Sequence, residues 1–131
     1  MKKYSKEIQI RRKDLCPIGY KMNQLTNSIE IDEVKATEIR NMFNTLAYEE
    51  PLSDEDITYM LVSLGNDGLA VISSIIQNSF YCGVIERNGE YYQGIHTPLI
   101  DMMTWGIANE NLANMLEKMV EIVKDCNNDK H

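Results

Sequence analysis

In the first half of the chain, hydrophobic residues recur every three or four positions, which is the spacing of a helix with one buried face. The spacing predicts a first helix over about 33–48, with Asp32 as its N-terminal cap and a polar, acidic outer face. Its apolar stripe consists of Ile39, Met42, Phe43 and Leu46. Pro51 cannot continue a helix and ends this element.

A second pattern predicts two short helices joined by a glycine-rich turn. Ser53 with Asp56 has the form of a capping box that opens the first of them. Its buried face consists of Ile57, Met60, Leu61 and Leu64. Residues 65–68 predict a turn, with a left-handed cap at Gly65 and a tight reversal at Asp67-Gly68.

The next helix is predicted over about 69–78. It buries Leu69, Ile72, Ile75 and Ile76, and it presents Ala70, Ser73, Ser74 and Gln77 on the opposite face. Two short helices with such a turn are typical of a helix-turn-helix, whose second helix reads the major groove of DNA. Any helical hairpin in a small α+β core has the same pattern, and residues 69–78 carry no Arg or Lys.

After Phe80 the pattern changes to alternation, which predicts a β-hairpin over 81–95. Asn88-Gly89 at its centre accepts the two positive φ angles of a type I′ turn. The register then pairs Arg87 with Glu90 and Ile85 with Tyr92. Residues 14–30, with Pro17, Gly19 and a run of Asn, Thr and Ser, predict irregular or short-strand structure.

A long helix is predicted from Met102, with Asp101 as its cap. Its stripe consists of Ala108, Leu112, Met115, Met119, Ile122 and Cys126. The stripe either packs on the core or forms a dimerisation seam, and it is too short to indicate a coiled coil. The fold class expected is therefore α+β: a small, mostly helical domain with a helix-turn-helix-like pair, a β-hairpin and a long C-terminal helix.

Composition indicates an ordinary globular domain. The 131 residues, 44% of them hydrophobic, suffice for a single core and predict one domain over 1–131. No apolar run approaches the length of a membrane span, and no apolar segment follows the basic N-terminus as in a secretory signal. The three cysteines, Cys16, Cys82 and Cys126, are far apart and odd in number, which favours reduced thiols in the cytoplasm.

Charge is distributed unevenly along the chain. The net charge of −7 argues against a general nucleic-acid binder, because non-specific affinity depends on neutralising phosphates. Residues 1–21, however, contain seven Lys and Arg against Glu7 and Asp14, which leaves −12 on the rest of the chain. Residues 1–14 form a basic arm that can either contact a phosphate backbone or be a solvated tail.

Five short pieces of the sequence follow one another in the order of a known domain. They are CPIGYK at 16–21, the segment 31–43, LSDEDI at 52–57, IIQNSFYCGV at 75–84 and NGEYYQGIHTPLID at 88–101. In order and nearly in spacing they resemble the recombinase domain of large serine site-specific recombinases, the resolvase–integrase family. The last piece is similar to that family's "G-x-Y-x-G-x-H-x-P-I-I-D". The resemblance covers about 15–117, and 118–131 is the end of the last helix and a tail.

The resemblance implies a DNA-binding module from a mobile element, which lies between a catalytic domain and a zinc ribbon in its relatives. It would dock on one half of an attachment site in double-stranded DNA. The basic residues Lys6, Arg11, Arg12, Lys13 and Lys21 would contact phosphates. Ser73, Ser74, Gln77 and Asn78 would face base edges.

The sequence also departs from the family. The turn at 65–68 is shorter than the family's and holds Asp67 where basic residues are usual, and "N-P" is Asn78-Ser79. We expect no catalytic residue, metal or cofactor, since Tyr4-Ser5 has no domain to hold it and Cys126 stands without a zinc ribbon. His96 is expected to make a structural hydrogen bond.

Two interpretations remain open. The first is a recombinase-type DNA-binding module without its own catalytic domain, which is not itself an enzyme. The second is a degenerate relative that acts through protein contacts, with the C-terminal helix seating a second copy or a recombinase partner. Basic side chains gathered around Ser73 and Gln77 would favour the first, and acidic ones the second.

Overall fold

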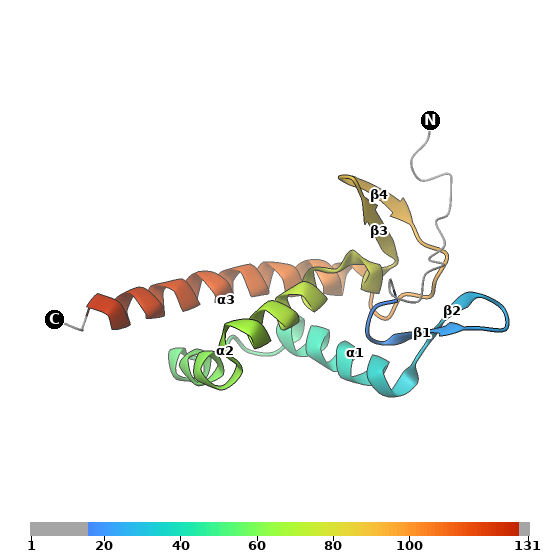
Figure 1. The fold of residues 1–131 in the computed structure, drawn as a ribbon. Coiled ribbons are helices and arrows are strands. Elements are labelled where there is room, and N and C mark those ends of the chain that lie inside the picture. The colour runs from blue at the N-terminus through green and yellow to red at the C-terminus, as the bar shows by residue number, and fades with distance from the viewer. Residues whose placement is uncertain (1–15, 129–131) are drawn as a thin grey trace.

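The computed structural model describes residues 16–128, so the basic arm and the end of the tail lie outside it (Figure 1). Its elements are two hairpins, three helices and one 3-10 helix, in agreement with the expected α+β class. In chain order they are β1 (Tyr20–Asn23), β2 (Ser28–Ile31), α1 (Glu33–Tyr48), α2 (Asp54–Gln77), η2 (Ser79–Cys82), β3 (Val84–Arg87), β4 (Glu90–Gln93) and α3 (Met102–Asn128).

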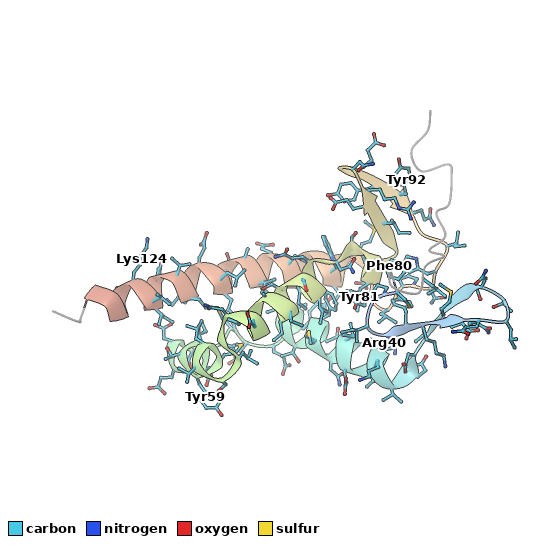
Figure 2. The ribbon with its side chains drawn as sticks, in the orientation of Figure 1. Arg40, Tyr59, Phe80, Tyr81, Tyr92 and Lys124 are labelled. Atoms are coloured by element: carbon cyan, nitrogen blue, oxygen red, sulfur yellow. The ribbon has the colours of Figure 1, made fainter. Side chains whose placement is uncertain are left out.

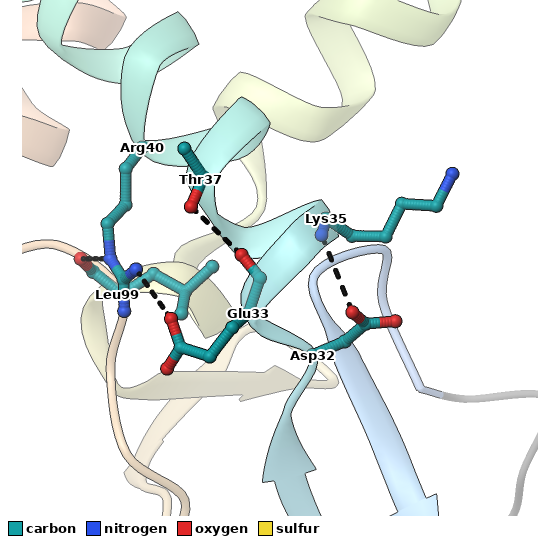
Figure 3. Close-up of polar contacts among 6 residues, drawn as sticks. All are labelled: Asp32, Glu33, Lys35, Thr37, Arg40 and Leu99. Carbon is teal, nitrogen blue, oxygen red and sulfur yellow. Dashed lines mark hydrogen bonds and ion pairs between the residues drawn. The ribbon is translucent and has the colours of Figure 1, made fainter.

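Each of the three helices begins at the cap that the sequence predicts. The Asp32 carboxylate accepts a hydrogen bond from the Lys35 N–H at 3.4 Å, as Figure 3 shows. The Ser53 hydroxyl accepts one from the Asp56 N–H at 3.2 Å, and the Asp101 carboxylate accepts one from the Thr104 N–H at 2.7 Å. These side chains satisfy backbone donors that have no partner inside the helix, which fixes where each helix starts.

The β3–β4 hairpin has the predicted register and turn. Arg87 pairs with Glu90 and Ile85 with Tyr92, and the two turn residues have positive φ. The expected start of the strand at Tyr81 is wrong, because η2 occupies Ser79–Cys82 and Gly83 ends it at φ 93°. The β1–β2 hairpin covers most of the segment over 14–30 and ends at Ile31, which agrees with the short-strand alternative.

The predicted four-residue turn in α2 is wrong. The backbone leaves the helical region at one residue, Gly65, with φ 69° and ψ −179°. Residues 66–68 are helical, so Asp67-Gly68 forms no reversal. Two helical arms therefore meet at a kink and run in different directions (Figure 1). The expected buried face is incomplete as well, since Ile57 is buried but Leu64 is exposed.

The core lies where α1, the second arm of α2, η2 and the start of α3 meet the two hairpins. Its largest fully buried side chains are Phe43, Ile76 and Tyr81. Of the α3 stripe, Ala108, Leu112 and Met119 are buried. The part of the stripe from Ala108 to Met115 packs on the core, as one of the two sequence interpretations has it.

One apolar stretch is longer than expected. Residues 54–82 contain a window of mean hydropathy 1.4 that would be long and apolar enough to cross a membrane by length and composition alone. The expectation that no stretch reaches this length is therefore wrong. The helix over this stretch is interrupted at Gly65, and its apolar side chains are divided between the core and the surface.

Candidate nucleic-acid interface

The residues predicted to contact DNA fall into three groups. Lys6, Arg11, Arg12 and Lys13 lie outside the described residues. Lys21 is exposed on β1, where its backbone pairs with Glu30. The remaining four lie at the C-terminal end of α2 or directly after it: Ser73, Ser74, Gln77 and Asn78. The structure therefore places the described candidates on two separate elements.

Two of the four polar side chains at the end of α2 already have local partners. The Ser74 hydroxyl donates to the Val71 carbonyl of its own helix at 2.8 Å. The Asn78 side-chain oxygen accepts from the Phe80 N–H at 3.0 Å, which caps η2. This bond turns the Asn78 side-chain oxygen toward η2 and uses one of its two acceptor positions, so Asn78 has a structural role as the cap of η2.

Helix α3 covers the last carbonyls of α2. The Asn109 side-chain amide donates to the Ile76 carbonyl at 2.8 Å and to the Trp105 carbonyl at 2.9 Å. The Trp105 indole donates to the Asn78 carbonyl at 3.2 Å. These contacts attach the end of α2 to α3. The part of this helix end that remains open to a DNA groove is the side that carries Ser73, Ser74 and Gln77. Of these three residues, Ser73 is half-buried.

Basic residues are absent from the sequence on either side of these four residues. The chain has no Lys or Arg over 41–86, and α2 carries Asp67 and three acidic residues in its first turn. Arg40 on α1 is engaged elsewhere, since its Nε donates to the Leu99 carbonyl at 3.3 Å and its Nη1 pairs with Glu33 at 3.4 Å (Figure 3). Lys118 on α3 pairs with Asp54 at 3.5 Å.

Four of the five sequence pieces that carry the family resemblance contribute to one buried cluster, to which the piece at 52–57 does not belong. Figure 2 labels Phe80 and Tyr81 of this cluster. The Tyr20 hydroxyl donates to the Thr97 carbonyl and the Tyr81 hydroxyl donates to the Ile18 carbonyl, both at 2.6 Å. Burial raises the pKa of both tyrosines, that of Tyr81 to about 12, so both hydroxyls stay protonated donors. These motif residues therefore hold the fold together and are not available to contact DNA.

His96 has the structural role expected of it. Its ring stacks on Phe80 with centroids 3.6 Å apart, and its Nε2 lies 2.7 Å from the Phe80 carbonyl. This contact requires Nε2 to carry the proton of the neutral ring. Burial lowers the pKa of His96, which favours that neutral form.

The described residues offer little other site chemistry. No group of three or more His, Cys, Asp or Glu that could hold a metal ion occurs among residues 16–128. Burial raises the pKa of the Cys16 and Cys82 thiols, which makes both poor nucleophiles.

Comparison with solved structures finds the same fold in two of them. In a crystal structure of an LSR, or large serine recombinase, in complex with DNA, the similarity covers 76% of this chain and 31% of that chain, with a TM-score of 0.54 and 20% identity. A structure from work on the sequence requirements of the Listeria innocua prophage attP site is similar over 79% of this chain and 44% of that chain, with a TM-score of 0.56 and 19% identity.

These likenesses show the fold. The chain spans less than half the length of either structure that it matches. No family model and no curated protein matches the sequence.

Proposed function

We propose that this chain is a DNA-binding module of the serine-recombinase type, which docks on one half of an attachment site and has no catalytic serine of its own. The observation that carries the proposal is the agreement of two likenesses, one in fold and one in sequence. The fold matches a recombinase–DNA complex over 76% of this chain. Five sequence pieces follow the order of the same domain. A fold alone would not indicate a function, so the site has to be tested directly.

The affinity for phosphates would come mainly from the basic arm. The basic residues within 16–128 are Lys21, Lys35, Arg40, Arg87, Lys118 and Lys124. Of these, Arg40 and Lys118 are engaged in ion pairs. The arm supplies Lys6, Arg11, Arg12 and Lys13 over a short stretch of sequence. Each phosphate that a Lys or Arg neutralises releases a counterion, so binding through the arm must weaken steeply with salt.

The test is the salt dependence of binding to a random-sequence DNA duplex, measured by fluorescence anisotropy. Changing Arg11, Arg12 and Lys13 together to alanine should weaken binding to all sequences. The slope of log affinity against log salt should become shallower by about 0.9 for each phosphate that the arm no longer neutralises. An unchanged slope in this triple variant would contradict the role of the arm.

A matched control separates direct phosphate binding from net charge. Lys35, Arg87 and Lys124 are exposed on α1, β3 and α3, and Figure 2 shows Lys124 far along α3. Changing these three to alanine removes the same charge from the body of the protein. We expect this control to lower the affinity less than the arm variant does, with a nearly unchanged slope.

A second candidate function is favoured by the exposed apolar side chains of α2 and α3. Tyr59, Val62, Val71, Val120 and Val123 are between 47% and 81% exposed, on a body of strongly negative charge. Apolar surface of this kind is typical of protein contacts. If the chain is a degenerate module that acts through a second copy or a recombinase partner, the wild type and the arm variant should both fail to bind DNA even at low salt.

The proposal also places the protein in the cytoplasm, as a component of a mobile element. Its DNA partner is the double-stranded attachment site, and we assign it no cofactor.

A further inference from the structure

We propose that the β1–β2 hairpin, through Lys21, Gln24 and Leu25, is the element that enters the major groove, and that the end of α2 is not. The inference rests on the proposed function and names the part of the chain that performs it. A two-stranded β-ribbon fits the major groove as well as a helix does.

The first argument is the distribution of carboxylates. Residues 15–29 contain no Asp or Glu and follow directly on the basic arm. Glu30 is the nearest acidic residue on the C-terminal side, and one of its carboxylate oxygens accepts from the Asn23 side-chain amide at 3.0 Å. An element that lies among phosphates must be poor in carboxylates, because like charges repel at close range. The loop of the hairpin meets this requirement, whereas on the strands Glu30 lies opposite Lys21. In the sequence, β1 and the loop follow shortly after the basic arm.

The second argument is the order of the hairpin loop. The Asn23 side-chain oxygen accepts from the N–H groups of Leu25 at 2.9 Å and of Thr26 at 3.2 Å. The Asn27 N–H donates to the Asn23 carbonyl at 2.7 Å, and the Thr26 and Ser28 hydroxyls lie 2.7 Å apart. A loop whose own hydrogen bonds already fix it loses less conformational entropy on binding.

The third argument is what the loop presents to its surroundings. Leu25 is 98% exposed, the highest value among the exposed large hydrophobic residues, and Gln24 beside it is exposed too. In the major groove an apolar side chain can contact the methyl group of thymine, and a glutamine amide can pair with adenine. Lys21, exposed on β1, can reach a phosphate while the tip contacts bases.

The fourth argument is the contrast with α2. At the end of α2, the Ile76 carbonyl accepts from Asn109 and the Asn78 carbonyl accepts from Trp105. The side chains of Ser74 and Asn78 have local partners as well. The β1–β2 hairpin projects away from the helices, with its loop at the edge of the molecule (Figure 1).

The experiment compares Lys21→Ala and Leu25→Ala with Arg87→Ala, a matched control in the other hairpin. The probes are duplexes that the wild type selects from a random-sequence pool, and the same duplexes with uracil in place of thymine. We expect K21A to make the salt slope shallower by about 0.9. We expect L25A to weaken binding about tenfold without changing the slope. Thermal melts should show L25A as stable as the wild type, since the side chain is almost fully exposed.

Uracil lacks the methyl group, so it should weaken the wild type and leave L25A unaffected, while R87A should behave like the wild type throughout. If K21A and L25A bind like R87A, the hairpin inference is wrong and the proposed function stands. An equal response of wild type and L25A to uracil would overturn the major-groove placement. If the wild type shows no salt-dependent binding, the proposed function fails and the hairpin inference fails with it.

Discussion

The two ends of the molecule differ in how their apolar surface is covered. At the hairpin end, defined by both hairpins, η2, α1 and the start of α3, the side chains of Tyr20, Phe80, Tyr81 and Ile85 are all buried. At the far end, defined by residues 54–64 of α2 and 113–125 of α3, Ile57 and Met119 are buried but do not belong to the main cluster. Figure 2 shows Tyr59 and Lys124 there, well away from Phe80 and Tyr81.

The difference shows which part of the sequence is constrained by folding. At the hairpin end, residues far apart in the chain depend on one another, as in the hydrogen bonds from Tyr20 to Thr97 and from Tyr81 to Ile18. A change there affects several elements at once. The far end is joined through fewer buried side chains and the exposed Lys118–Asp54 ion pair, which contributes little in water. We therefore expect the far end to open locally at a lower free energy.

The largest expected effect is a difference in the free energy of unfolding between a substitution at the hairpin end and one at the far end. Phe43 is fully buried and its ring lies 5.6 Å from that of Tyr81, whereas Tyr59 is 75% exposed. Phe43→Ala should lower the free energy of unfolding by about 3–5 kcal/mol through the cavity that it leaves. Tyr59→Ala should change it by less than about 0.5 kcal/mol. Urea denaturation measures both, and similar decreases would contradict the division into two ends.

The sequence predicts those elements well whose ends are set by local chemistry. Asp32, Ser53 and Asp101 cap helices through backbone groups three residues away, and Asn88-Gly89 sets a hairpin by its own φ angles. Such interactions need no distant partner, so a short stretch of sequence contains all the information.

The errors in the predicted fold arise where distant contacts decide the local structure. Tyr81 suits a strand, but η2 places it against Tyr20 and Phe43 and lets its hydroxyl reach Ile18. Burial of an aromatic ring outweighs a strand preference worth about 1 kcal/mol. At 65–68 one glycine with positive φ suffices to redirect the chain, and Asp67 and Gly68 then continue as helix.

The candidate site is predicted less well than the fold. Helical periodicity correctly places Ser74 and Gln77 on the exposed side of α2. It cannot show that Trp105 and Asn109, some thirty residues later, cover the end of this helix. The sequence does not single out the loop of the β1–β2 hairpin, because a run of Asn, Gln and Thr indicates a turn and gives no indication of which turn projects from the surface.

The next largest expected effect is a loss of stability on substitution of Gly65, at the kink in α2 between the far end and the core. Gly65 has φ 69° and ψ −179°, a conformation that is almost restricted to glycine. Gly65→Ala should cost about 1–3 kcal/mol even though nothing lies within 4 Å of the added Cβ. Hydrogen exchange should show the decrease in protection concentrated at residues 54–64.

Gly106 is the matched control for that substitution. It lies within α3 with helical backbone and open space around an added Cβ. Gly106→Ala should stabilise the protein by about 0.5–1 kcal/mol, because alanine favours the helix and restricts the unfolded chain. If Gly65→Ala is equally stabilising, α2 can straighten at no cost and the far end is not held by the kink.

The smallest effect is a pH dependence confined to the hairpin end. Burial lowers the pKa of His96 below its ordinary value of 6.5, so the unfolded chain binds a proton more readily than the folded one. The stabilisation is complete above pH 6.5 and is lost as the pH falls through the lowered pKa of the folded state. His96→Gln retains a donor for the Phe80 carbonyl but cannot titrate. Melting temperatures of the wild type should fall relative to this variant across that interval. Parallel curves would show that folding does not lower the pKa of His96.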